Sequence, residues 1–512
     1  MTMSSRDDRR AVLTGLLSVA LGGLAVGGLA GCARPWTNLS ADQVPADLDI
    51  PVRFQANADG AQAAWPRDDW WKGFGSEPLN GLIAQAIRSN FDVAAAVARI
   101  AQADAQVRAA SAPLLPVLNG TASPSWRHFG LGTGTGTRVV LGNGSIDTRS
   151  YAFGLSASYQ LDLWGRNLAQ RQAAIQSAMF TRFDQRTVAL TVVTSVANTW
   201  FTALALADRL AIAQRNVADA SRALEVVRGR MAAGTATALD AANQETLVAV
   251  QRTNIPNLTN QLRQAVNGLG LLLGAPPERI TVKPDTLTSL SLPVVTPGLP
   301  SGLLERRPDI AAVEAELQAS GYDVTVARLA FYPSVTLTGS AGFQAAALNQ
   351  LINPGGFIAS LAASLLAPVF DGGTMRAALD RARGRQVELL ASYRKAVVQA
   401  FTDVDNALTA WRYTSEQEGL QRDAVRTARR AAEIALAQMR AGTADITAVL
   451  TAQTSSYNAD DTLAQVRLAR CQALLNLYKA MGGGWVKGGG RYPGLEPGLL
   501  EGGFALPVGG NR

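Results

Sequence analysis

The sequence predicts a membrane protein of mixed α and β class. Its few strands complete a β-barrel only together with strands of other chains, and long helices follow these strands. Three observations support this prediction. The chain contains two copies of one unit, each copy has segments with an apolar residue at every second position, and each copy ends in long segments with helical spacing of apolar residues. Together they predict two tandem structural repeats.

The repeat is visible as two pairs of matching segments about 210 residues apart. Asp92 and Asp309 begin similar segments in which a proline follows 24 residues later. Gly234 and Gly442 lie in a second pair, and another glycine follows each of them after 40 residues. Order and spacing agree in both copies, which indicates an internal duplication. Each copy is predicted to open with a helix, which in the first copy covers residues 80–112.

A pair of strands follows the opening helix in each copy, and a Gly-rich loop at 129–145 is predicted between the two strands of the first pair. Apolar residues alternate with small or polar ones over 151–162 and over 335–343, and 357–369 continues the pattern less regularly. The polar positions hold Ser, Thr and Gly rather than Lys and Glu. An apolar outer face with a small, polar inner face is typical of a membrane barrel strand. A half-buried sheet of a soluble domain is the alternative.

The number of strands predicts self-association. Four strands per chain cannot close a membrane barrel, which needs at least about eight. An open sheet edge in lipid would leave backbone groups without hydrogen-bond partners. The barrel must therefore be shared between several copies of the chain.

Long helices follow the strands. Residues 166–231 contain no proline and keep apolar residues at coiled-coil spacing, and a helix of this size is roughly 100 Å long at 1.5 Å per residue. Gly234-Thr235 then turns the chain back, and Gly442-Thr443 does the same in the second copy. Each copy is thus predicted to end in a helical hairpin.

Composition excludes several function classes. The net charge is +7 and basic residues are mixed with acids, so nucleic-acid binding is not expected. His128 is the only histidine and there are two cysteines, which are too few for a His/Cys metal site or a Ser–His–Asp triad. We expect neither an enzyme nor a cofactor or metal. We expect no segment after the N-terminus to be long and apolar enough for a membrane-spanning helix.

The N-terminus has the pattern of a secretory signal. Basic residues precede an uncharged segment at 11–31, whose six glycines make a permanent membrane helix the weaker interpretation. Leu29-Ala30-Gly31-Cys32 resembles the bacterial lipoprotein box, in which the cysteine receives the lipid. Cys32 is therefore the predicted lipid-attachment site. Because the chain has two cysteines, a disulfide between Cys32 and Cys471 is possible, but lipid attachment at Cys32 makes it the less favoured interpretation.

These patterns predict a domain organisation. The segments, in chain order, are a signal peptide (1–31), a lipidated N-terminal segment (32–79), repeat 1 (80–275), a Pro-rich linker (276–300), repeat 2 (301–482) and a Gly/Pro-rich tail (483–512) that we expect to be disordered or extended.

Several motifs resemble the TolC/OprM-type outer-membrane efflux family, in its lipoprotein branch. They are YQLDLWGR at 159–166, GLPSGLLERRPDI at 298–310, PVFDGG at 368–373 and NLYKAMGGGW at 476–485. The resemblance implies a homotrimer with a 12-stranded barrel in the outer membrane and a long helical barrel through the periplasm. It also implies passive conduction of small molecules such as drugs, toxic compounds or metals. The implied partners are outer-membrane lipid, a periplasmic adaptor and an inner-membrane pump of the RND type.

The resemblance also suggests site residues. The turns at Gly234, Thr235, Gly442 and Thr443 would form the periplasmic tip that meets the adaptor. Asp445 beside the second turn is a candidate gate residue, because three copies would form a ring of carboxylates. The alternative is an ordinary acid at a helix N-terminus.

Two other functions remain open at this point. A type I protein-secretion channel would have the same fold. A periplasmic adaptor lipoprotein with a coiled-coil hairpin would lack the repeated strand pairs.

Overall fold

The computed structural model describes residue 54 and residues 65–130, 145–280, 286–293 and 300–487. The predicted signal peptide, Cys32, most of the predicted Gly-rich loop and most of the predicted tail lie outside this part of the chain.

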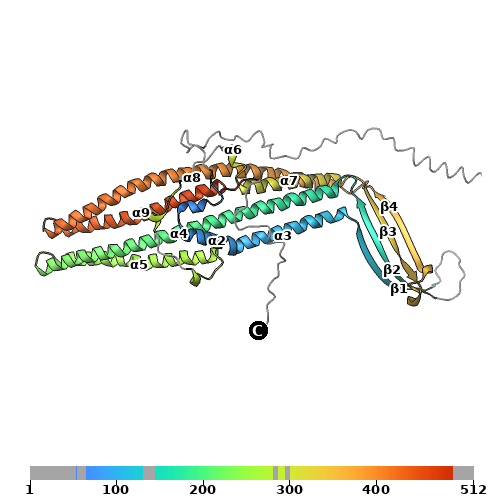
Figure 1. Ribbon diagram of the computed structural model, residues 1–512, viewed down its shortest axis with the longest axis horizontal. Helices are drawn as coiled ribbons and strands as arrows, with labels where there is room; N and C mark the ends of the chain where they lie inside the picture. Colours follow the sequence, from blue (N-terminus) through green and yellow to red (C-terminus); the bar gives the residue numbers. More distant parts are fainter. Residues whose placement is uncertain (1–53, 55–64, 131–144, 281–285, 294–299, 488–512) are drawn as a thin grey trace, which may run out of the picture. The chain divides into compact units, whose positions relative to one another are not determined.

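Two long helical hairpins dominate the described structure (Figure 1). The first hairpin consists of α4 (Arg166–Ala232) and α5 (Ala238–Leu272), and the second of α8 (Thr374–Arg440) and α9 (Ile446–Ala480). Corresponding helices have equal lengths, 67 residues for α4 and α8 and 35 for α5 and α9. The predicted hairpins and their repetition are confirmed.

The opening helix of each copy differs from the prediction. Instead of one helix over 80–112, the first copy has α2 (Glu77–Ser89) and α3 (Phe91–Ser111), separated by Asn90. The Asn90 side chain accepts hydrogen bonds from the backbone of Asp92 and Val93, which caps α3, and donates one to the Leu272 carbonyl. Because a capping residue has an extended backbone, the helix ends there.

The second copy begins in the same interrupted way, with α6 (Pro300–Leu303) and α7 (Pro308–Leu329). Arg307 lies between them and is buried. Its guanidinium bonds to the carboxylates of Asp309 and Asp403 and to the Ala480 carbonyl. The second arginine of the RRPDI motif thus joins α7, α8 and α9.

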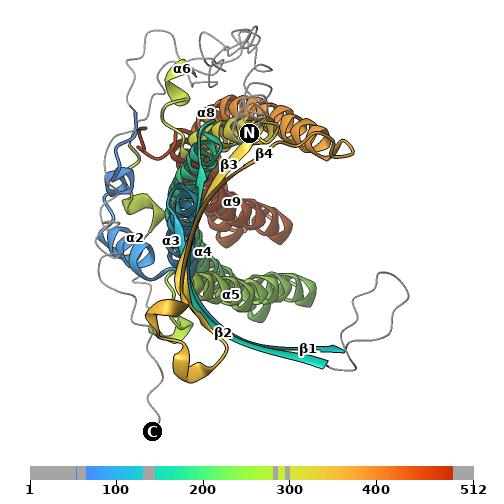
Figure 2. The ribbon, with the colours of Figure 1, turned by 90° about the vertical axis from the view of Figure 1, so that its right-hand side faces the viewer.

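One antiparallel sheet contains all four strands of the described chain, in the order β1–β2–β3–β4. The strands are β1 (Val117–Gly130), β2 (Ser145–Leu161), β3 (Ser334–Ala345) and β4 (Phe357–Leu366). Figure 2 shows them as a single curved sheet. Strands of the two copies meet where β2 pairs with β3. The count of four strands is confirmed, but β4 ends at Leu366, so the predicted continuation to Val369 is wrong. Pro368, which has no backbone N–H to donate, lies two residues after Leu366.

The main core lies where the two copies meet. Trp200 and Phe201 of α4 are buried there together with Trp70 of a short 3-10 helix, η1 (Trp70–Phe74). The Trp70 ring stacks on Tyr478 of α9, with 4.7 Å between the ring centroids. Such a contact adds about 0.5–1.5 kcal/mol beyond burial. The segment before the first repeat therefore ties repeat 1 to repeat 2. The remaining short 3-10 helices are η2 (Ala112–Leu114), η3 (Pro277–Arg279), η4 (Leu287–Ser289), η5 (Leu348–Gln350) and η6 (Pro354–Gly356).

The start of the predicted tail is packed rather than extended. Trp485 is buried and its ring meets that of Phe183. Lys487 forms an ion pair with Glu314 at 2.7 Å. The prediction of a disordered or extended tail from residue 483 is thus wrong for 483–487, because one large aromatic residue finds a place in the core.

Helix α4 contains an 18-residue window that is apolar enough to cross a membrane, by length and composition alone. The prediction that no segment after the N-terminus would be so apolar is wrong for this helix. In the structure 67% of that window is buried, as in the core helix of a protein. Val193, Trp200 and Leu204 of α4 belong to that buried part.

Candidate functional site

The turns of the two hairpins have the same local geometry. Gly234 and Gly442 have φ angles of 74° and 75°, in the left-handed region that glycine adopts without strain. Thr235 donates its backbone N–H to the Arg230 carbonyl at 2.8 Å, and Thr443 donates to Gln438 at 2.9 Å. Both threonine hydroxyls bond to the same carbonyls at 3.1 Å. These bonds close each helix end in a Schellman-type turn.

The helices after the turns begin with capping residues. In the first hairpin Thr237 and Asp240 form a reciprocal capping box. In the second hairpin Asp445 is the N-cap of α9, and its carboxylate accepts the backbone N–H of Thr447 at 3.1 Å. Its alternative interpretation as an acid at a helix N-terminus is thus confirmed. The side chain is nevertheless exposed, so its charge faces solvent in the isolated chain.

The ends of the two hairpins contact each other. Val227 and Ala241 of the first hairpin pack with Met439 and Ile446 of the second in a small apolar cluster. Arg230 also donates a hydrogen bond to the Met439 carbonyl. The structure therefore brings the neighbourhoods of the two predicted tip turns together.

Two polar links join the hairpins farther from the turns. Gln244 donates to Gln453 at 3.2 Å, and both side chains are buried. Arg209 of α4 forms a two-pronged ion pair with Asp461 of α9, with N···O distances of 2.7 and 3.0 Å. Sequence analysis missed both links. For the glutamines a signal existed, since they follow the turn glycines of their copies by similar distances.

An ionic cluster lies inside the second hairpin. The Glu418 side chain is 4% exposed and is surrounded by Arg422, Arg467 and Arg470. Burial on its own would raise the pKa of Glu418, but hydrogen bonds from Arg470 and Arg422 oppose it, and the net shift is downward. Arg470 also lies over the Trp411 ring, 4.9 Å from its centroid. The carboxylate therefore stays ionised and ties α8 to α9.

The sheet has two chemically different faces. The register aligns one row of aromatic residues and, on the opposite face, one row of serines. These rows are Phe153, Phe343 and Phe357, and Ser156, Ser340 and Ser360. Apolar side chains such as Leu361 and Leu365 are 86% and 70% exposed. A sheet with this much exposed apolar surface needs a partner or a lipid environment.

A sequence model described as "Outer membrane efflux protein" matches residues 82–275 and 299–483, once in each repeat. The chain belongs to this family. The relatives it resembles include the pyoverdine export outer membrane protein OpmQ of Pseudomonas aeruginosa, with 40% identity over 86% of this chain and 93% of OpmQ. The cation efflux system protein CusC of Escherichia coli is 29% identical, over 89% of this chain and 97% of CusC.

Solved structures of channels share the fold of this outer membrane efflux protein. The outer-membrane channel OprN superposes with a TM-score of 0.77 at 26% identity, covering 86% of this chain and 98% of OprN. The open state of the MtrE channel of Neisseria gonorrhoeae gives 0.77 at 28% identity, covering 86% and 96%. The predicted fold class and function class, an outer-membrane efflux channel, are confirmed. Its location in the outer membrane explains the apolar face of the sheet.

Cys32 lies outside the described residues. Cys471 of the efflux protein is buried in α9 without a disulfide partner among the residues that the structure describes. Burial raises the pKa of its thiol to about 12. Cys471 therefore behaves as an apolar core residue.

Proposed function

We propose that three copies of this chain form the outer-membrane channel of a tripartite efflux system and conduct small molecules passively. The observation that carries the proposal is the four-stranded sheet, whose outer strands β1 and β4 have no further partner strand in the described chain. An unpaired edge in lipid is costly, and each chain supplies only half of the smallest known barrels. Three chains give twelve strands, as the family resemblance implies.

Disulfide cross-linking across the proposed junction tests this arrangement. Leu118 of β1 and Leu361 and Leu365 of β4 all lie on the apolar face of the sheet. Within one chain β1 and β4 are three strand spacings apart, about 14 Å, which no disulfide can bridge. L118C combined with L361C or L365C should therefore give covalent trimers. L118C combined with L337C of β3 is the matched control, since these strands are never neighbours.

Two outcomes of the cross-linking experiment would contradict the proposed trimer. A purely monomeric product, with a single-chain mass in detergent, would remove the trimer. Covalent dimers or tetramers as the closed species would correct the number of chains.

The tip turns are proposed to contact a periplasmic adaptor, which would connect the channel to an inner-membrane pump of the RND type. Residues Gly234, Thr235, Gly442 and Thr443 are all exposed in the single chain. A Cβ added at either glycine would meet no atom within 4 Å. Small, exposed residues let another protein approach the backbone of the turns closely.

Asp445 is proposed as a gate residue in addition to its capping role. Three copies would place three exposed carboxylates at the periplasmic end, and a ring of like charge favours cations. In planar bilayers D445N should therefore lower the cation preference of the open channel. Thr237→Asp at the matching position of the first hairpin should raise it. An unchanged reversal potential in both variants would leave Asp445 with its structural role alone.

Cys32 is proposed as the lipid anchor. Radiolabelled palmitate should enter the wild-type protein but not C32A, while C471A should label normally. Labelling that persists in C32A would place the lipid elsewhere.

Small molecules are the favoured cargo. Relatives of this chain are named for pyoverdine, for cations and for antibiotics, although they share one architecture. This variety supports a wide, weakly selective channel and favours efflux over a type I protein-secretion channel. A periplasmic adaptor does not fit a chain of this family. Susceptibility profiling of a deletion strain against drugs and metals, with assay of secreted siderophores, tests the cargo class.

A further inference from the structure

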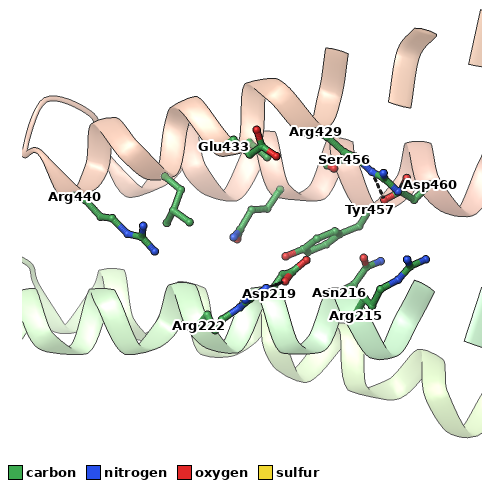
Figure 3. A pocket seen from close by; sticks show the side chains of 13 residues that line it. Arg215, Asn216, Asp219, Arg222, Arg429, Glu433, Arg440, Ser456, Tyr457 and Asp460 are labelled. Carbon is green, nitrogen blue, oxygen red and sulfur yellow. Dashed lines mark hydrogen bonds and ion pairs between the residues drawn. The ribbon is translucent and has the colours of Figure 1, made fainter. Parts of the chain in front are cut away.

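A cavity of about 490 Å³ lies between the two hairpins, near the tip (Figure 3). Its walls come from α4, α8 and α9. Figure 3 shows the Tyr457 ring of α9 crossing the gap toward α4, with Arg440 toward the turn and Arg215 at the opposite end. The volume lies in the range of small-molecule sites.

A buried polar group points into this cavity without a partner. Tyr457 is 6% exposed, and its hydroxyl has no hydrogen-bond partner in the described structure. A buried hydroxyl without a partner is destabilising, so such groups are normally satisfied by a protein atom, water or a ligand. Burial and the nearby Asp219 raise the pKa of Tyr457, so the hydroxyl remains a donor at physiological pH.

The charges around Tyr457 are not balanced. Arg222 pairs with Asp219, and Arg429 pairs with Asp460 at 2.8 Å. The other ionised side chains at the cavity are Arg215, Arg440 and Glu433, and none of them has an ion pair in the described part of the chain. They leave one positive charge in excess.

We propose that this cavity binds a small anionic molecule with a phosphate or carboxylate group. Arg440 and Arg215 supply positive charge from the two ends of the cavity, and the Tyr457 hydroxyl between them donates a hydrogen bond that it otherwise lacks. Charge-assisted hydrogen bonds of this kind are the strong ones. Glu433 opposes the anion from α8, which favours a ligand that also carries a donor group.

A ligand at the Tyr457 hydroxyl would lie between the two hairpins, because α4 of the first and α8 and α9 of the second form the walls of the cavity. A molecule bound to both stabilises the arrangement in which they are close. If opening moves the hairpins apart, the anion favours the closed channel. This consequence rests on the proposed function, whereas the binding itself does not.

Isothermal titration of the purified full-length protein in detergent tests the site, with inorganic tripolyphosphate and citrate as separate probes at fixed ionic strength. We expect saturable binding of one probe molecule per chain, and the stronger of the two distinguishes a phosphate from a carboxylate ligand. Y457F, which removes only the hydroxyl, and R215Q/R440Q should each weaken binding about tenfold or more. R252Q, on the exposed face of α5, is the matched control and should bind normally.

Size-exclusion chromatography and thermal melting verify that each variant is folded. Binding that is equal in the wild type, Y457F and R215Q/R440Q would show general attraction to surface charge and overturn the site. Absence of binding for both probes would do the same. Bilayer conductance with and without the bound probe then tests the effect on opening. A wild type that neither trimerises nor conducts would refute the proposed function, while the titration still decides the site.

Discussion

Substitutions at Gly442 can distinguish the effect of backbone strain at the tip turn from the effect of a blocked contact with a partner protein. The φ angle of 75° at Gly442 costs an ordinary L-residue about 1–2 kcal/mol. No atom lies within 4 Å of an added Cβ, so size adds nothing to this cost in the single chain. G442A and G442W should therefore lose about the same stability. G442N should lose less, since asparagine tolerates the left-handed region.

Export should follow a different order. If a partner packs closely on the tip, G442W blocks it and abolishes export, whereas G442A and G442N retain most of it. The assay is resistance of a deletion strain that carries each variant at equal abundance, alongside thermal melting and trimer content of the purified proteins. Equal export by G442W and G442A would refute close docking at this turn. Loss of export in G442N, with a stable trimer, would show that the glycine itself is needed. The same series at Gly234 shows whether both turns are contacted.

Three further predictions concern the helices. Single and double alanine variants of Arg209 and Asp461 should show a coupling of about 1 kcal/mol in the free energy of unfolding. Loss of the pair should raise the open probability of the channel in bilayers about fivefold. Additive effects of the two substitutions would show that the two residues do not interact. Because the folded pKa of Glu418 is lowered, its stabilising effect is complete above the unfolded pKa of about 4.3 and is lost as the pH falls through the lower folded value. Thermal melting of E418Q should therefore depend less on acid pH than that of the wild type, and parallel curves would contradict the shift. Cys471 should resist maleimide in the folded protein and react in denaturant, since its buried thiol has a pKa of about 12; rapid labelling of the native trimer would show that α9 opens.

Sequence patterns predicted the features that depend on residues close to one another in the sequence. The long helices follow from apolar spacing and the strands from alternation, and the Gly-Thr turns need only a glycine at one position. The break at Asn90 is marked locally, since its side chain caps α3 at Asp92 and Val93, and the apolar spacing that continues across it hid this signal. Only the bond from Asn90 to the Leu272 carbonyl, 182 residues away, depends on the folded chain. The end of β4 was misjudged because apolar residues continue the alternation after the last ladder pair, at Leu366.

Contacts between the hairpins could not be predicted in the same way. The pairing of Arg209 with Asp461 depends on the rotation of α4 against α9, to which a helical pattern gives only a rough guide. The unpartnered hydroxyl of Tyr457 appears only once the surrounding helices are in place. The burial of α4 likewise depends on its neighbours, since its hydropathy alone would also suit a membrane helix.

The two hairpins show what duplication retains and what it changes. With the turn glycines aligned, Glu418 and Arg470 of the second hairpin correspond to Leu210 and Leu262 of the first. Those leucines pack against an apolar cluster, so leucine and ion pair occupy equivalent places between equivalent helices. Replacing a buried ion pair by apolar residues is often neutral or stabilising, so the ionic cluster is not needed to hold the second hairpin together. Its hydrogen bonds are directional, whereas leucine contacts are not, so we expect the second hairpin to resist axial displacement of its helices more than the first. Hydrogen exchange of α5 faster than that of α9 would agree with this, and equal exchange would contradict it.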